Sequence, residues 1–269
     1  MNNFLATLKS IAKIVLQSRP VKNMPAPEGS RIIVMGNGPS LNDTIASHLP
    51  LLKSTPSMAV NFAALAPVFL DIRPRYYVLA DPHFFGASDN GGNLDKLRQA
   101  LACVEWKMTL FVPAKFLKAA RKHYSGLDLK PFNFIGLEGY DAFTHAAFRA
   151  GLGMPRPRNV LVPAIMLAIG MGYKEVVITG ADHSWMKTLS VTDDNEVVSV
   201  QPHFYADSDS ELSRIRHDYQ GIRLHEVVES FAIAFRSYHH IVRYASSRGV
   251  RVLNATPGSF IDAFERIKL

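Results

Sequence analysis

Five polar residues each follow directly after an apolar run of β type, and their side chains could together bind a small polar ligand. They are Asn37, Asn61, Asp81, Asp182 and Asn254. The carboxyl ends of parallel strands meet at one edge of a sheet, so these side chains are expected to line one crevice. One such residue taken alone is more often a loop or capping residue. The five together favour a ligand site.

The turn after the first apolar run carries the residue types of a phosphate site. It consists of Gly36, Asn37, Gly38, Pro39 and Ser40, and a helix is expected to begin at position 41. The two glycines can adopt positive φ, the proline suits a first helical turn, and the serine can cap the helix. Free N–H groups and the helix dipole would then face a phosphate. The alternative is a tight turn without a ligand, and neither GxGxxG nor GxxxxGK[ST] is present.

The composition is that of a soluble globular protein with one domain or one and a half. The chain has 269 residues, of which 48% are hydrophobic and 20% charged. Cys103 is the single cysteine, so an internal disulfide is excluded and a reducing, cytoplasmic location is expected. We see no cleavable signal peptide and no apolar stretch long enough to cross a bilayer.

The net charge of +7 requires an explanation, and much of the excess lies before residue 30. The basic residues there are Lys9, Lys13, Arg19 and Lys22. Apolar residues recur among them at helical spacing, which predicts a basic amphipathic helix and linker over residues 1–29. This helix could lie on an anionic membrane, at the inner face of the cytoplasmic membrane, or dock on the domain. Nucleic acid is not favoured, because basic residues are not interleaved with aromatic ones.

Strand and helix signals alternate over residues 30–269, which predicts an α/β, Rossmann-like, mostly parallel sheet with helices on both faces. The expected strands are 31–35, 57–60, 76–79, 108–112, 132–135, 175–179 and 251–253. The expected helices are 41–53, 92–103, 114–123, 159–171 and a helical region from about 213 to 248. Residues 191–210 are polar and acidic without periodicity, so a lid is expected at about 183–215.

Three segments carry a resemblance to a known family. They are the strand with Gly-Asn-Gly-Pro-Ser-Leu, the run Asp-Pro-His-Phe-Phe at 81–85, and residues 168–182, which end in Gly-Ala-Asp. With Asn61 they resemble the bacterial CMP-sialic-acid-dependent sialyltransferases. They also resemble the wider group with the MptE-like hydroxymethylpterin diphosphokinases and the flagellin nonulosonate-transfer factors. The resemblance covers roughly residues 30–260 and implies a Rossmann-like domain with a lid over a CMP-sugar site that needs no metal.

The resemblance also implies roles for the residues of the crevice. Asn37 and the turn at 36–40 would hold the phosphate and ribose of the nucleotide. Asn61 would face the donor, and Asp81 stands where those enzymes have an asparagine before the same proline. Asn159 falls near the residues that meet the donor carboxylate and nucleotide.

The general base of that family is a histidine before an aromatic pair in the lid, and His203 holds the matching position here. The chemistry supports the same choice. An inverting transfer needs a group that takes the proton of the acceptor hydroxyl, and imidazole titrates near working pH.

The chain departs from the family after Asp182, where two lid tyrosines would assist the leaving phosphate. His183, Ser184 and Lys187 stand there instead and could neutralise the departing phosphate. Hydroxyls after the last strand, at Thr256 and Ser259, could meet the nucleotide base or phosphate, or could hold the turn. No metal site is predicted, because the histidines of the 217–240 region lack HExxH spacing. The basic residues of this region could instead line an acceptor or phosphate pocket, or lie on a solvated helix face.

The function that these residues favour is an inverting, metal-independent glycosyltransferase. Its donor would be a nucleotide-activated sugar such as a CMP-nonulosonate, its acceptor a surface glycan or lipid-linked molecule, and it would need no cofactor. One alternative is an MptE-like diphosphokinase with Mg²⁺ held by Asp81 and Asp182. The other is a non-catalytic nucleotide-binding assembly protein. A homo-oligomer stays open, as does the identity of the sugar.

Overall fold

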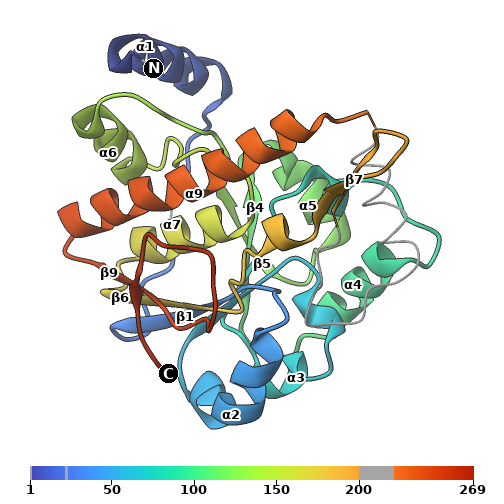
Figure 1. Ribbon diagram of the computed structural model, residues 1–269. Coiled ribbons are helices and arrows are strands. Elements are labelled where there is room, and N and C mark those ends of the chain that lie inside the picture. The colour runs from blue at the N-terminus through green and yellow to red at the C-terminus, as the bar shows by residue number, and fades with distance from the viewer. Residues whose placement is uncertain (1, 22–23, 200–220) are drawn as a thin grey trace.

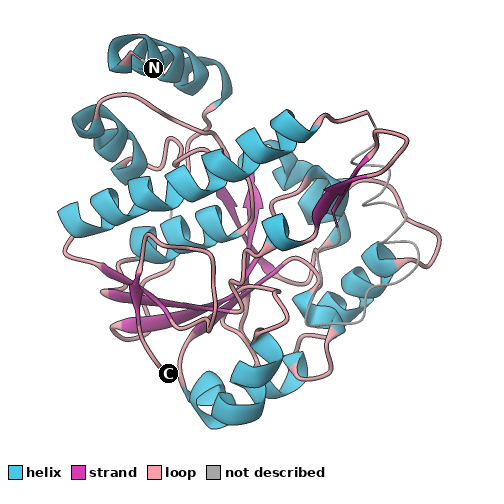
Figure 2. Cartoon of the chain, viewed as in Figure 1, coloured by secondary structure: helices cyan, strands magenta, loops and turns pink. Residues whose placement is uncertain are grey.

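The central feature of the computed structural model is an eight-stranded sheet in the order β10-β9-β6-β1-β2-β3-β4-β5 (Figures 1 and 2). Every pairing in it is parallel, from β1 with β2 and β6 outward to the edges. The structure describes residues 2–21, 24–199 and 221–269. The predicted α/β fold with a mostly parallel sheet is confirmed.

The strands of this sheet are short and mostly buried. Their bounds are β1 Arg31–Met35, β2 Ser57–Val60, β3 Tyr76–Val78, β4 Thr109–Pro113, β5 Asp128–Phe132, β6 Glu175–Thr179, β9 Arg251–Asn254 and β10 Glu265–Arg266. A separate antiparallel pair consists of β7 Leu189–Val191 and β8 Val197–Ser199.

Helices cover both faces of the sheet. The α-helices are α1 Asn3–Gln17, α2 Leu41–Ser54, α3 Phe69–Ile72, α4 Asn93–Ala102, α5 Leu117–His123, α6 Asp141–Arg149, α7 Leu161–Met171 and α9 Leu224–Ser247. Short 3-10 turns are η1 Ala63–Leu65, η2 Pro82–Phe85, η3 Ala114–Phe116 and η4 Trp185–Lys187.

The central strand β1 is apolar from Ile32 to Met35 because these residues are buried on both sides of the sheet. Ile32 and Val34 join the core beneath α7 and α9, whereas Ile33 and Met35 join the core beneath α2 to α5. The side-chain period of two along a strand sends neighbouring residues to opposite faces. A parallel sheet between two helical layers therefore needs an unbroken apolar run, as this strand has.

Helix α7 lies between the sheet and α9 (Figure 1). Apart from Gly170, all of its residues are buried. A helix that is apolar all round has no solvent face, so it must occupy the middle of a layered core. This position fixes the start of α7, where the predicted site residue Asn159 lies, against both the sheet and α9.

Two expectations about secondary structure were wrong. The strand expected at 132–135 lies at Asp128–Phe132, because Pro131 is tolerated in β5, an edge strand of the sheet. The loop expected from residue 191 begins with the hairpin of β7 and β8. Val197 and Leu189 pack there against Phe231 of α9. Strands of three residues are too short to show a period in the sequence. The rest of the expected lid, from residue 200 to 215, lies outside the described residues.

The N-terminal segment does form the predicted helix, and it docks on the domain beside α6 (Figure 1). Ser10 Oγ donates to the carbonyl of Glu138 at 2.7 Å, and Lys13 Nζ donates to the carbonyl of Gly136 at 3.1 Å. Docking thus uses the polar face of α1. None of the described helices combines the length and the apolar character needed to span a bilayer.

Candidate functional site

The carboxyl edge of the sheet has its topological switch point between β1 and β6. From β1 the chain adds β2 to β5 on one side, and it then returns to place β6 on the other side. Open α/β sheets bind ligands outside this point. The turn Gly36–Ser40 after β1, Asn61 after β2 and Asp182 after β6 therefore lie at this edge of the sheet.

The two glycines of the first turn have a different role from the expected one. Neither Gly36 nor Gly38 has a positive φ. The N–H of Gly36 donates to the carbonyl of Thr179 at 2.8 Å, and that of Gly38 donates to the carbonyl of Gly180 at 2.8 Å. Both donors are thus used by the end of β6. The expectation that they would hold a phosphate is corrected.

Glycine is needed here because two backbones approach each other closely. A Cβ on Gly36 would lie 2.5 Å from the carbonyl oxygen of Gly180. A Cβ on Gly38 would overlap Asp182 Oδ2 and lie 2.8 Å from the same carbonyl oxygen. Cβ atoms in proteins essentially never lie this close to other atoms. Glycine at these two positions therefore allows the turn after β1 to contact the segment after β6.

Ser40 and Asp182 bond to each other across the switch point. Ser40 Oγ donates to Asp182 Oδ2 at 2.7 Å and makes no side-chain cap for α2, contrary to expectation. A capping residue normally has extended backbone angles, whereas Ser40 has a φ of −63° and a ψ of −12°, in the α-helical region. The pair joins the turn after β1 to the segment after β6.

Asn37 and Asn61 each present a buried amide oxygen that has no hydrogen-bond partner among the described residues. Asn37 Nδ2 donates to the carbonyl of Val60 at 3.1 Å, which leaves Oδ1 as the unmet acceptor. Asn61 has a φ of 50°, and its carbonyl accepts from Tyr77 Oη at 2.6 Å. Buried polar atoms are nearly always paired, so these two point to a partner such as a water molecule or a ligand group.

Asn159 adds a third unmet atom of the opposite kind. Its Oδ1 accepts from the N–H groups of Leu161 and Val162 at 3.0 and 3.3 Å, and so caps α7. Tyr238 Oη donates to the same oxygen at 3.0 Å. Nδ2 of Asn159 is buried without a partner. The oxygen thus holds the side chain in place, while the two N–H groups stay available to a water molecule or a ligand group.

His183 completes this network from the end of β6. Its Nε2 lies 2.5 Å from Tyr238 Oη, and its ring lies 4.2 Å from that of Trp185. Because Asn159 Oδ1 can only accept, the tyrosine proton points there and His183 donates through Nε2. Nδ1 of the neutral ring is then an acceptor.

Burial lowers the pKa of His183 from 6.5 to about 3. The imidazole is therefore neutral at working pH. The expected role of His183 as a cation beside a departing phosphate does not fit this environment. Burial also raises the pKa of Tyr238, so its hydroxyl stays protonated.

The remaining residues predicted around the donor are exposed or half-buried. Lys187 is exposed, with Nζ 5.2 Å from the ring centre of Phe260. Ser184 is half-buried and its carbonyl accepts from the N–H of Lys187 at 2.9 Å. Asp81 is exposed and caps η2, accepting from the N–H of His83 at 2.8 Å. Lys187 is the cation that this group can offer to an anion.

Thr256 and Ser259 hold the turn after β9 in place. Thr256 Oγ1 accepts from the N–H of Ala181 at 3.1 Å, and Ser259 Oγ donates to the carbonyl of Ala181 at 2.6 Å. Asn254 Nδ2 donates to Ser259 Oγ at 3.0 Å. Both hydroxyls are buried and hydrogen-bonded within the protein. They hold the turn, which was one of the two roles expected for them, and a contact with the nucleotide is not needed to explain them.

His203 lies outside the described residues, so its place relative to the crevice is not seen. Within the described ranges, His, Cys, Asp and Glu side chains nowhere gather in the groups of three that could hold a metal ion. Tyr238 was not among the predicted site residues. The sequence pattern that could have identified Tyr238 is its position on the apolar face of α9, with Ala234 and Ile241. A buried phenol on such a face needs a polar partner.

No protein-family profile and no curated protein matches the chain. Among solved structures it is similar to the MAf glycosyltransferase from Magnetospirillum magneticum AMB-1, with a TM-score of 0.51 and 13% identity. This similarity covers 99% of the chain and 38% of that protein, so the chain spans well under half of its length. A likeness to mannonate dehydratase from Streptococcus suis serotype 2 has a TM-score of 0.20 and carries no argument. The first match shows a shared fold.

Replacing Gly38 by alanine should destabilise the protein. The new Cβ meets Asp182 and the backbone of Gly180, so the two turns must separate, at about 1–3 kcal/mol of unfolding free energy. Urea denaturation measures this. Gly126→Ala is the matched control, because open space surrounds that position. Equal stability of the two variants would contradict the close approach of β1 and β6.

His183 should make stability fall as the solution becomes acidic. Below pH 6.5 an unfolded histidine binds a proton that the buried ring does not bind until about pH 3. Protonation therefore stabilises the unfolded state relative to the folded state. The free energy of unfolding falls by up to about 1.4 kcal/mol per pH unit. His183→Asn, which tolerates the φ of 51°, should show a shallower decline between these pH values in urea titrations. An unchanged slope would mean that His183 is not buried as a neutral ring.

Proposed function

We propose that the chain is a glycosyltransferase that binds a nucleotide-activated sugar in the crevice between the ends of β1, β2 and β6. The observation that carries this proposal is the set of unmet hydrogen-bonding atoms on Asn37, Asn61 and Asn159. They come from three segments that the fold brings to one edge. The shared fold with a solved glycosyltransferase supports the same class of reaction.

The chemistry of the three atoms suits a nucleoside or a sugar. Two amide oxygens accept hydrogen bonds and one amide nitrogen donates them, and all three groups are uncharged. Hydroxyls and the N–H groups of a base match such a set. We propose a CMP-linked nonulosonate as the donor, on the strength of the three sequence segments that resemble the sialyltransferases.

The phosphate of the donor is expected near Lys187 and away from the glycine turn. The N–H groups of Gly36 and Gly38 are already bonded, whereas the ammonium of Lys187 is exposed beside Phe260. A cation there would stabilise the charge that develops on the leaving nucleotide. His183 would act as a positioning residue, since it holds Tyr238 and through it Asn159.

In the proposed transfer, His203 takes the proton of the acceptor hydroxyl as its oxygen bonds to the anomeric carbon. The bond from that carbon to the phosphate breaks, and the nucleotide leaves with the electron pair. The acceptor would be a surface glycan or a lipid-linked molecule. The reaction as proposed needs no metal ion.

Thermal unfolding with CMP, CDP, UDP, GDP and ATP, each with and without Mg²⁺, tests the site. A ligand at about a hundredfold over its dissociation constant adds roughly 2.7 kcal/mol, which raises the melting temperature measurably. We expect CMP to stabilise the protein without Mg²⁺. Stabilisation by ATP only with Mg²⁺ would replace this proposal by the diphosphokinase.

Asn159→Asp should weaken CMP binding by about tenfold or more. The variant keeps the oxygen that caps α7 and replaces the unmet donor by an acceptor, so a ligand acceptor loses its partner. Asn93→Asp is the matched control, because Asn93 also begins a helix and also has a buried, unmet Nδ2. Titration calorimetry measures both. Equal affinity in the two variants would remove Asn159 from the site.

His203→Ala should lower turnover by about 10² to 10⁴ with little change in donor affinity, because the imidazole acts on the acceptor. The measurement is the rate of transfer from the donor that the unfolding screen identifies. A variant that binds donor and keeps near-normal turnover would exclude His203 as the base. Nucleotide binding without any transfer in the native protein would favour the assembly protein.

A further inference from the structure

Helix α1 turns its apolar face away from the protein. The large apolar side chains that it exposes are Phe4, Leu5, Leu8, Ile11, Val15 and Leu16, with exposed fractions from 42 to 80%. Its buried residues are Ala6 and Ser10, on the opposite side of the helix. A helix on the surface of a globular domain normally has the reverse arrangement. An apolar partner is therefore needed to cover α1.

The orientation of α1 is fixed by specific bonds, so the helix cannot simply roll over. The carbonyl and the N–H of Glu138 both bond Ser10 Oγ, at 2.7 and 2.9 Å. The N–H of Tyr140 donates to Thr7 Oγ1 at 3.1 Å. A Cβ on Gly139 would lie 2.9 Å from Thr7 Cα, so this residue must be small. The close fit holds the polar face inward.

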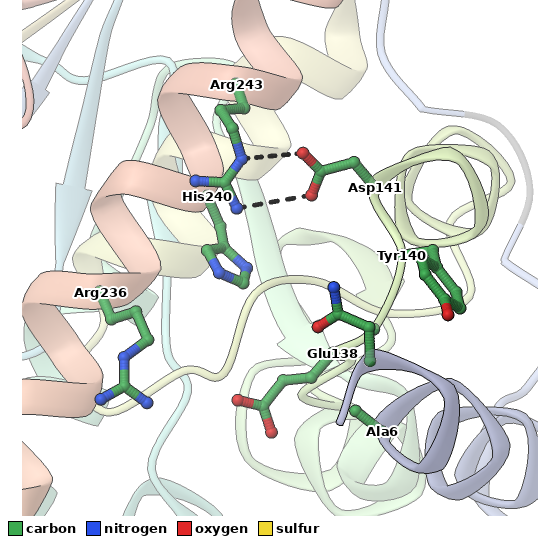
Figure 3. A pocket seen from close by; sticks show the side chains of 9 residues that line it. Ala6, Glu138, Tyr140, Asp141, Arg236, His240 and Arg243 are labelled. Carbon is green, nitrogen blue, oxygen red and sulfur yellow. Dashed lines mark hydrogen bonds and ion pairs between the residues drawn. The ribbon is translucent and has the colours of Figure 1, made fainter. Parts of the chain in front are cut away.

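Lys9 is exposed on α1, whereas Lys13 bonds the carbonyl of Gly136 on the docked side. Residues 2–19 contain Lys9, Lys13 and Arg19 and no acidic residue. A pocket of about 600 Å³ lies between α1, the loop at 138–141 and α9 (Figure 3). Arg243 in this pocket is bonded to Asp141 at 2.9 Å. Arg236, which also lines it, has no ion-pair or hydrogen-bond partner in the part of the chain that the structure describes.

A contact between the α1 helices of two copies of the chain would be too small for a stable dimer. Fifteen residues of helix are roughly 22 Å long and about 10 Å across, so two such helices cover a few hundred Å² per copy. A stable interface buries about 800 Å² per partner. A lipid surface has no such limit, and anionic headgroups complement the exposed Lys9 and Arg19.

We infer that α1 binds an anionic phospholipid surface, with its apolar face between the headgroups and the exposed Lys9 beside a headgroup phosphate. Tyr140 is 52% exposed beside α1, where its ring would lie at headgroup level (Figure 3). Binding of this kind combines apolar burial with attraction to anionic lipid. The inference does not depend on the proposed transferase, because it concerns a different face and needs no activity.

The test is co-sedimentation of the full chain with vesicles of phosphatidylcholine, alone or with phosphatidylglycerol. We expect binding to the anionic vesicles that weakens as salt is raised. Leu8→Asp with Ile11→Asp should lower the partition at least about tenfold. Lys9→Gln should lower it about fivefold. Leu70→Asp is the control, because Leu70 is 58% exposed on α3.

Circular dichroism melting confirms that each variant is folded. The inference fails if the native chain does not sediment with anionic vesicles, or if the Leu8 and Ile11 variant sediments as the native chain does. It also fails if light scattering shows that the native chain is a dimer and the Leu8 and Ile11 variant a monomer, while the native chain does not bind vesicles. A loss of binding in the Leu70 variant equal to that at Leu8 and Ile11 would equally contradict a role for α1.

Discussion

The close contact between the ends of β1 and β6 is the constraint on which the site depends. Two backbone hydrogen bonds join Gly36 to Thr179 and Gly38 to Gly180, both at 2.8 Å. They form because neither glycine carries a side chain that would keep the turns apart. The contact falls at the switch point of the sheet, where an open α/β fold would otherwise present free N–H groups. It therefore uses the N–H groups of the two glycines, which the turn alone suggests as phosphate donors.

What replaces them is a site held together by neutral groups. Ala181 is fixed by the turn after β9, and His183 then reaches Tyr238 on α9. Tyr238 bonds Asn159 at the start of α7, which is buried in the middle of the core. Burial keeps both His183 and Tyr238 uncharged at working pH, as the directions of their pKa shifts indicate. A rigid, uncharged set of amides suits recognition of hydroxyls and bases better than recognition of bare phosphate.

Helices α1 and α7 show how position gives similar residues different roles. Both are rich in apolar side chains, but α7 lies between the sheet and α9 and buries them on every side. Helix α1 docks through Ser10 and Lys13 and so leaves its apolar side uncovered. The hydrophobic effect acts on both, since apolar surface leaves water wherever a partner is available. For α1 the proposed partner is a lipid surface.

The sequence by itself determined the alternation of strands and helices, the amphipathic N-terminal helix and the polar residues that follow the strands. These features follow from periodicity and turn chemistry, which act over a few residues. The tertiary structure decided that Gly36 serves packing, that Ser40 bonds Asp182, and which face of α1 points outward. It also decided that His183 is neutral. Each of these outcomes depends on segments far apart in the chain that compete for the same hydrogen bonds and the same buried space, and local sequence carries no record of that competition.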